Sequence, residues 1–177
     1  VYKENLYKPM PGYRFIASNT DRSRYYVGEL NGRSSKQAYM DALHISESNI
    51  INQTFHNPLG KMNGQDICII SLKEVSGNGL CCYRQVNDSD VLVLLEEQDY
   101  NEILDETLQR IRRDFNHISG VFSINCVFRY LLFSQEHHME DYLKTMSTLG
   151  DHAGLIGFGE HYNQQFVNQT MTCVVFE

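Results

Sequence analysis

An amphipathic helix expected between two buried strands constrains the fold more than any other feature of this sequence. From Asp99 to His117, apolar side chains recur at helical spacing, acidic residues occupy the first turns and arginines occupy the last. The run 91–95 before this helix is wholly apolar, and the run 120–124 after it suits a second buried strand. Because a helix between two strands has to cross over, the pattern predicts a helix packed on a sheet.

The remaining periodicity extends this pattern along the chain. Strands are predicted at 13–18, 25–30, 67–72, 80–85, 153–158 and 170–176, and helices at 34–43 and 139–149. Residues 46–64 are predicted to form a long loop with room for one helical turn. The order is therefore ββαβββαβαββ, with hairpin-like turns between the early and middle strands. We expect an α+β fold in which helices pack on a mixed or antiparallel β-sheet. The length of 177 residues predicts one domain.

Charge and composition exclude several classes of partner. The net charge of −7 makes the surface repel nucleic-acid phosphates, so we expect no nucleic acid as a partner. The longest apolar run, 127–133, contains Arg129 and is far shorter than the roughly 20 residues of a membrane span. We therefore expect no membrane segment. The five cysteines include no CxxC pair, which favours reduced thiols in a cytoplasmic protein.

Two charged residues stand where local structure does not explain them. Arg129 interrupts an apolar run, in which a permanent charge needs a partner. It can form an internal salt bridge, pack its stem while its head reaches water, or bind a carboxylate or phosphate as a fork. Glu160 follows the glycine-flanked segment 154–159, where a ligand can approach the backbone. It can receive an ammonium group or hydrogen-bond loop amides.

Three smaller residues accompany this pair. Cys126 ends a predicted strand three residues before Arg129, where it is either a small buried side chain or a nucleophile activated by a nearby cation or histidine. We favour the buried side chain, because most buried cysteines are inert. Asn168 and Thr170 open the last predicted strand, and they suit either a neutral polar ligand group or a strand-entry turn.

Motifs for metals and cofactors are absent from the sequence. The densest histidine groups, His137-His138 and Glu160-His161, lack the spacing of a metal-binding helix such as HExxH. The glycines around Phe158 do not have the spacing of a dinucleotide fingerprint, and there is no Walker loop. We therefore expect no metal, no cofactor and no catalytic residue, and we do not expect an enzyme.

Four short segments occur in one order along the chain. They are YVGELNGRS at 26–34 followed by QAY at 37–39, NCVFR at 125–129, GFGE at 157–160 and NQTMT at 168–172. In that order they resemble the C-terminal half of the FIST sensory domain, named for F-box and intracellular signal transduction proteins. The chain departs from the family pattern at Asn125, at Phe128 and in the shortened Phe158-Gly159 stretch, changes that narrow or redirect a pocket.

The resemblance implies a division of the chain and a set of partners. Residues 25–177 correspond to the FIST C-terminal domain, and residues 1–24 to a segment connecting it to an N-terminal FIST half that this chain lacks. The family implies an intracellular sensor of small ligands, such as amino acids, that works with that N-terminal half and an output domain of the parent protein.

The resulting expectation places opposite charges in one pocket. Arg129 would hold the carboxylate of a small-molecule ligand such as an amino acid, and Glu160 would hold its ammonium group. Cys126, Asn168 and Thr170 would complete the ligand-binding site. The alternative is a protein-interaction or dimerisation module, in which Arg129 and Glu160 bind each other and only brace the fold.

Overall fold

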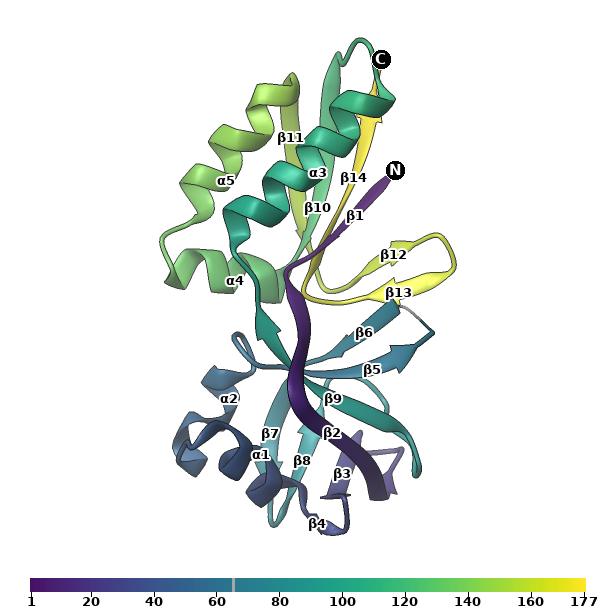
Figure 1. Ribbon diagram of the computed structural model, residues 1–177, viewed down its shortest axis with the longest axis vertical. Helices are drawn as coiled ribbons and strands as arrows, with labels where there is room; N and C mark the ends of the chain where they lie inside the picture. The colour runs from purple at the N-terminus through teal and green to yellow at the C-terminus, as the bar shows by residue number, and fades with distance from the viewer. Residues whose placement is uncertain (65) are drawn as a thin grey trace. The chain divides into compact units, whose positions relative to one another are not determined.

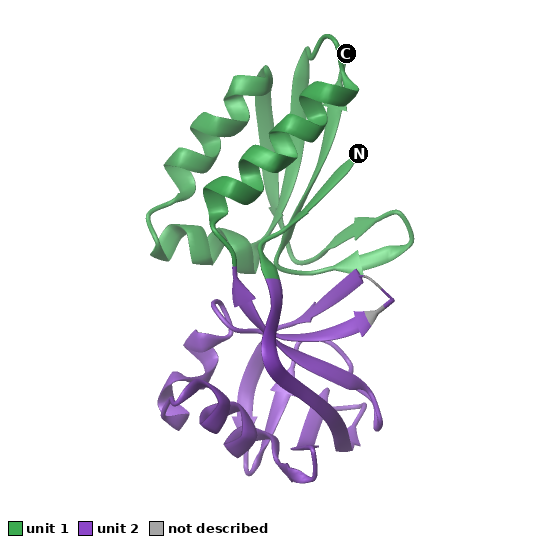
Figure 2. Ribbon diagram, viewed as in Figure 1, with its two compact units in different colours: residues 1–7, 98–177 green, residues 8–97 purple. Residues whose placement is uncertain are grey.

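Two sheets organise the chain, and each belongs to its own unit. The computed structural model describes residues 1–64 and 66–177. Unit 1 comprises Val1–Tyr7 and Gln98–Glu177, and unit 2 comprises Lys8–Glu97 (Figure 2). No described helix combines the length and the apolar character that crossing a membrane requires.

Unit 1 contains a four-stranded mixed sheet, helices and a small hairpin (Figure 1). Its elements are β1 (Tyr2–Asn5), α3 (Tyr100–Asp114), β10 (Gly120–Cys126), α4 (Val127–Gln135), α5 (Met139–Met146), the 3₁₀ turn η2 (Ser147–Leu149), β11 (Asp151–Gly157), β12 (Glu160–Tyr162), β13 (Gln165–Val167) and β14 (Thr170–Phe176). The strand order is β1-β14-β10-β11, in which β10 and β11 are parallel and the other pairs antiparallel. The predicted α+β class, a mixed sheet with packed helices, is confirmed.

The central helix of unit 1 forms where its amphipathic pattern predicts it. Asp99 caps α3 by accepting hydrogen bonds from the backbone N–H groups of Asn101 and Glu102. The helix packs against β1. Its buried face consists of Leu104, Thr107, Leu108 and Ile111. The charges on its other face need no functional explanation, because they lie on the solvent side and complement the helix dipole.

Unit 2 contains the second sheet, in which eight strands pair. Its elements are β2 (Tyr7–Asp21), β3 (Tyr26–Leu30), β4 (Arg33–Ser34), α1 (Ser35–Leu43), the 3₁₀ turn η1 (Glu47–Asn49), α2 (Ile50–Gln53), β5 (Leu59–Asn63), β6 (Asp66–Ile70), β7 (Leu72–Ser76), β8 (Gly79–Cys82) and β9 (Val91–Glu97). The strand order is β6-β5-β9-β2-β3-β8-β7, and β4 pairs with β3. Helix α1 contacts β3 and β8, and α2 contacts β7.

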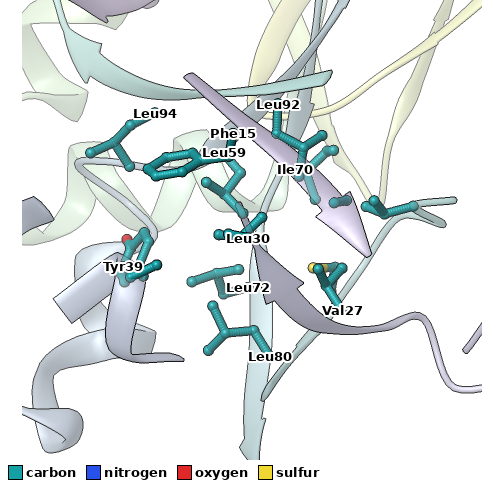
Figure 3. Packing of buried hydrophobic residues seen from close by; sticks show 14 of the residues in the cluster. Phe15, Val27, Leu30, Tyr39, Leu59, Ile70, Leu72, Leu80, Leu92 and Leu94 are labelled. Atoms are coloured by element: carbon teal, nitrogen blue, oxygen red, sulfur yellow. The ribbon is translucent and has the colours of Figure 1, made fainter. Parts of the chain in front are cut away.

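The core of unit 2 is a continuous apolar cluster. Helix α1 contributes Tyr39, which is fully buried, and its hydroxyl donates a hydrogen bond to the carbonyl of Asn57 at 2.7 Å. Figure 3 shows this ring beside leucine side chains of the sheet. The strands contribute Phe15, Val27, Leu30, Leu59, Ile70, Leu72, Leu80, Leu92 and Leu94, among others. In β9, for example, Leu92 and Leu94 are two positions apart and therefore point to the same face of the strand.

Two stretches fold differently from the sequence expectation. The loop predicted at 46–64 contains η1, α2 and β5, and that prediction was wrong for β5 because its strand form depends on β6 and β9 on either side. The apolar run 127–133, which was given no element, forms α4. Its buried residues Arg129, Leu132 and Phe133 recur at helical spacing. A short apolar run alone does not distinguish strand from helix.

Residues 1–24, expected to be a connecting segment, form strands of both sheets. β1 pairs with β14 over four residues, with Tyr2 opposite Cys173, so it is an edge strand of the sheet of unit 1. β2 pairs with β3 in unit 2. The four residues of β1 are too few to show a strand period, and their pairing with β14 depends on a segment more than 160 positions away.

Candidate functional site

All five residues predicted to bind a ligand lie in unit 1, around the junction of β10 and α4. Cys126 ends β10 and Arg129 lies in the first turn of α4, whereas Glu160 begins β12 and Thr170 begins β14. Asn168 lies two residues before β14. Every one is more than nine-tenths buried. Folding therefore gathers them in one unit although they are up to 44 positions apart in the chain.

Arg129 has a partner that the sequence analysis did not name. Its Nη2 donates to Oε1 of Glu4 on β1, and the two side chains are 1% and 0% exposed. The guanidinium carbon also lies 4.6 Å from the ring centroid of Phe133 and 5.5 Å from that of Tyr142. Within the described part of the chain, Arg129 Nε and Nη1 and Glu4 Oε2 have no hydrogen-bond partner. The ion pair is thus buried, but some of its hydrogen-bonding atoms have no partner in the described chain.

Glu160 is held by two residues that were also expected in the ligand-binding site, Thr170 and Cys126. Thr170 Oγ1 donates a hydrogen bond of 2.8 Å to Oε2, and the thiol of Cys126 donates another to the carboxylate. Burial raises the pKa of Glu160 to about 7, although these hydrogen bonds and the charge of Arg129 oppose the rise. Among the described residues, Oε1 finds no hydrogen-bond partner. This carboxyl group therefore changes protonation near neutral pH.

Cys126 is not placed as a reactive thiol. Burial, and then the charge of Glu160, raise the pKa of Cys126, although backbone N–H groups of Gln169, Phe128 and Arg129 oppose the rise. A nucleophilic cysteine needs the opposite shift. His152 and His161, the two histidines closest in sequence to Glu160, have other neighbours: His152 contacts Ser123, and the ring of His161 packs on Phe166.

The glycines before Glu160 have a steric role. Gly159 has φ +119°, and a Cβ there would lie 2.3 Å from the ring of Phe166 and 3.1 Å from Oδ1 of Asn168. A side chain at this position would therefore displace β13 or Asn168. This close approach brings Asn168 beside the turn that presents Glu160, so four of the five predicted residues form one contiguous cluster. Arg129 joins it through the contact of its backbone N–H with Cys126.

A cavity of about 320 Å³ lies beside this cluster in the same unit. It is lined by residues of β10, β11, α4 and α5, and none of the five predicted residues lines it. Five side chains on its wall carry polar groups but were not part of the predicted ligand-binding site: Ser123, Asn125, Tyr130, Tyr142 and His152. The signal for two of them was present, because Ser123 and Asn125 are alternate polar residues in an otherwise apolar strand.

Glu4 was also missed, and the sequence held no signal for it. It lies 125 positions from its partner, in a short strand with mixed polarity. In the described ranges, no group of three or more His, Cys, Asp or Glu side chains is arranged to hold a metal ion. None of the five cysteines forms a disulfide.

Comparison with known proteins identifies the family. The family model described as the FIST C domain matches residues 36–163, which is more than two thirds of the chain. No curated protein and no solved structure matched the chain. The matched range contains three of the five predicted site residues, Cys126, Arg129 and Glu160. The chain belongs to the FIST C domain family, whose members are generally sensory domains of signal-transduction proteins.

Proposed function

We propose that this domain senses a small ligand with opposite charges, of the amino-acid class, in the cluster of Glu4, Arg129 and Glu160. One observation carries the proposal: buried charged groups in one unit retain unused hydrogen-bonding atoms. These atoms are Arg129 Nε and Nη1, Glu4 Oε2 and Glu160 Oε1, with no partner in the described chain. Such atoms are costly to bury unless water or a ligand satisfies them.

The geometry supports a division of roles between the two ends of the ligand. Arg129 presents two free donors, which suit a carboxylate, and Glu160 presents a free acceptor, which suits an ammonium group. Thr170 and Cys126 fix the orientation of Glu160. The salt bridge to Glu4 leaves Arg129 only partly available, so ligand binding involves rearrangement of this pair. A rearrangement of β1 is a physical route by which occupancy changes the parent protein.

The same features favour a binding domain over an enzyme. The raised pKa of Cys126 leaves it protonated at neutral pH, so it is a poor nucleophile. Free thiols at all five cysteines are compatible with a cytoplasmic location. We propose that the domain acts together with an N-terminal FIST half and an output domain of its parent protein.

Calorimetric titration of the chain with each common amino acid at pH 8 tests the proposal. At this pH Glu160 is mostly ionised, so an ammonium group should bind best. We expect one or a few amino acids to bind and Glu160→Gln to weaken binding at least tenfold. Thr170→Val, which keeps the shape but removes the hydrogen bond to Glu160, should weaken it less. Arg113→Ala, at an exposed arginine of α3, is the matched control and should leave binding unchanged.

Absence of binding by any amino acid to the folded wild-type chain would contradict the proposal. It would favour the second candidate function, a protein-interaction or dimerisation module. One observation supports that candidate: Arg129 has an internal partner, Glu4, which braces β1 against α4. Under it, the chain should form a dimer of constant size by light scattering, with no small molecule raising its melting temperature.

A further inference from the structure

We propose that the cavity beside α5 in unit 1 is a second ligand site, which takes a small neutral molecule with an apolar body and one hydrogen-bond donor. The site goes beyond the proposed amino-acid site, because none of Glu4, Arg129 and Glu160 lines it. Its volume is about 320 Å³, at the lower end of the range of roughly 300–1,000 Å³ for small-molecule pockets. A single aromatic ring with a short substituent fits such a volume.

The walls of the cavity are largely apolar. Met139 and Leu143 of α5 and Leu155 and Ile156 of β11 contribute to its lining. Leu143, Leu155 and Ile156 are each about half exposed, so the cavity reaches the surface between the helix and the edge strand. No Asp, Glu, Lys or Arg lines it, so a charged ligand would be desolvated there without a counter-charge.

A continuous row of polar side chains forms one wall. Asn125 Nδ2 donates to the hydroxyl of Tyr142 at 3.0 Å, and that hydroxyl donates to Ser123 Oγ at 3.2 Å. Ser123 Oγ lies 2.9 Å from Nε2 of His152. Gly154 makes room for this row, because a Cβ at that position would lie 2.6 Å from Ser123 Oγ. The row is therefore a built feature of the cavity.

Counting protons along the row assigns its two ends. The single proton of Tyr142 goes to Ser123, and the hydroxyl of Ser123 donates to Nε2 of His152 when that nitrogen is the unprotonated one of the imidazole. The imidazole is then neutral. Burial lowers the pKa of His152, which supports the neutral form at neutral pH. In this arrangement Asn125 Nδ2 and the hydroxyls of Tyr142 and Ser123 each donate one hydrogen bond to the next residue of the row.

The other end of the row supplies the acceptor for the ligand. Asn125 is 7% exposed and lines the cavity, and its Oδ1 has no hydrogen-bond partner in the part of the chain that the structure describes. A buried amide oxygen in this state is satisfied by a donor from outside the protein. The donor has to be neutral for the reason given above, so an alcohol, phenol or indole N–H is the chemistry that fits.

Titration of ¹⁵N-labelled chain, followed by NMR, with benzyl alcohol, phenol, toluene, anisole and benzoate tests the site. We expect phenol or benzyl alcohol to shift amide signals of β10, β11 and α5 and to bind about fivefold more tightly than toluene. Anisole, which can only accept, should bind no better than toluene. Benzoate should bind more weakly than anisole or toluene.

Two substitutions with a matched control locate the binding. Leu143→Trp should fill the mouth of the cavity and abolish the shifts, whereas Leu131→Trp, at a comparably exposed leucine of α4 outside the cavity, should not. Asn125→Leu should keep toluene binding but remove the preference for phenol. Amino-acid binding should survive Leu143→Trp, which separates the two sites.

The proposal is overturned if toluene binds the wild-type chain as tightly as phenol, or if benzoate or anisole binds best. It is also overturned if no probe binds the folded chain, or if Leu131→Trp abolishes binding as Leu143→Trp does. Because Leu143 is partly exposed, its substitution tests the site even if Asn125→Leu fails to fold.

Discussion

The two units bury different kinds of side chain. Among the residues of unit 2 whose burial is described, the buried polar ones are the neutral Ser35, Thr54 and Ser71, of which Ser35 and Thr54 bond backbone groups. In unit 1 the buried set includes the charged residues Glu4, Arg129 and Glu160. Buried charges rarely increase stability over an apolar core of the same shape. The difference indicates that unit 2 is packed for stability, whereas unit 1 retains polar groups for which binding is the explanation we propose.

The largest effect should come from removing the arginine of the buried ion pair. Arg129→Met leaves the carboxylate of Glu4 buried without a counter-charge, so the free energy of unfolding should fall by about 3–5 kcal/mol. Urea denaturation followed by far-UV circular dichroism measures it. The double variant Glu4→Gln/Arg129→Met should recover part of the loss, and the exposed Arg113→Ala should change little. A loss below about 1 kcal/mol for Arg129→Met would mean that Glu4 is neutral or solvated.

A core truncation in unit 2 should be nearly as large but should act on stability alone. Leu30 is fully buried in the apolar cluster, so Leu30→Ala should lower the free energy of unfolding by about 3 kcal/mol (Figure 3). At temperatures where the variant remains folded, the affinities of unit 1 for its ligands should be unchanged. Loss of ligand binding in folded Leu30→Ala would break the comparison, because it would assign the binding function to unit 2 as well.

A smaller effect should appear as a pH dependence that comes from Glu160. Its pKa is raised from 4.5 to about 7. Between pH 4.5 and pH 7, the folded chain therefore keeps a proton on Glu160 that the unfolded chain has lost. This contribution to stability is complete below pH 4.5 and is lost as the pH rises through 7. The unfolding free energy of the wild type minus that of Glu160→Gln should therefore fall by about 2 kcal/mol from pH 5 to pH 8. A constant difference would show that Glu160 titrates normally.

A site residue could be predicted from the sequence when the pattern that marks it lies within a few neighbouring residues. Arg129 and Glu160 were found because each breaks an apolar or glycine-rich context within a few residues. Glu4 was not found, because only the pairing of β1 with β14 brings it to Arg129. Asn125 was noted as a departure from the family pattern but was not included in the predicted site, because the predicted strand ended at residue 124, one position short of the second inward polar residue of β10.

Helices and strands were likewise predicted correctly where the residues that determine them are close together in the sequence. Helix α3 was predicted within a few residues of its ends, because its cap, its apolar face and its dipole charges lie within one segment. β5 was not predicted, because a strand of five residues between two others owes its form to neighbours that the local pattern does not show. Helix α4 was missed because a short apolar run is compatible with the periodicity of a helix and with that of a strand.

The smallest effect should be the same in both units, which makes it the internal standard for the comparison. Asp99 caps α3 in unit 1, and Ser34 caps α1 in unit 2 by accepting from the backbone N–H of Gln37 at 3.2 Å. Asp99→Ala and Ser34→Ala should each lower the free energy of unfolding by about 1 kcal/mol in urea denaturation. Neither cap touches a buried charge, so neither should alter ligand affinity. If Asp99→Ala weakened binding while Ser34→Ala did not, the sensitivity of unit 1 would extend beyond its buried polar residues to the helix that covers them.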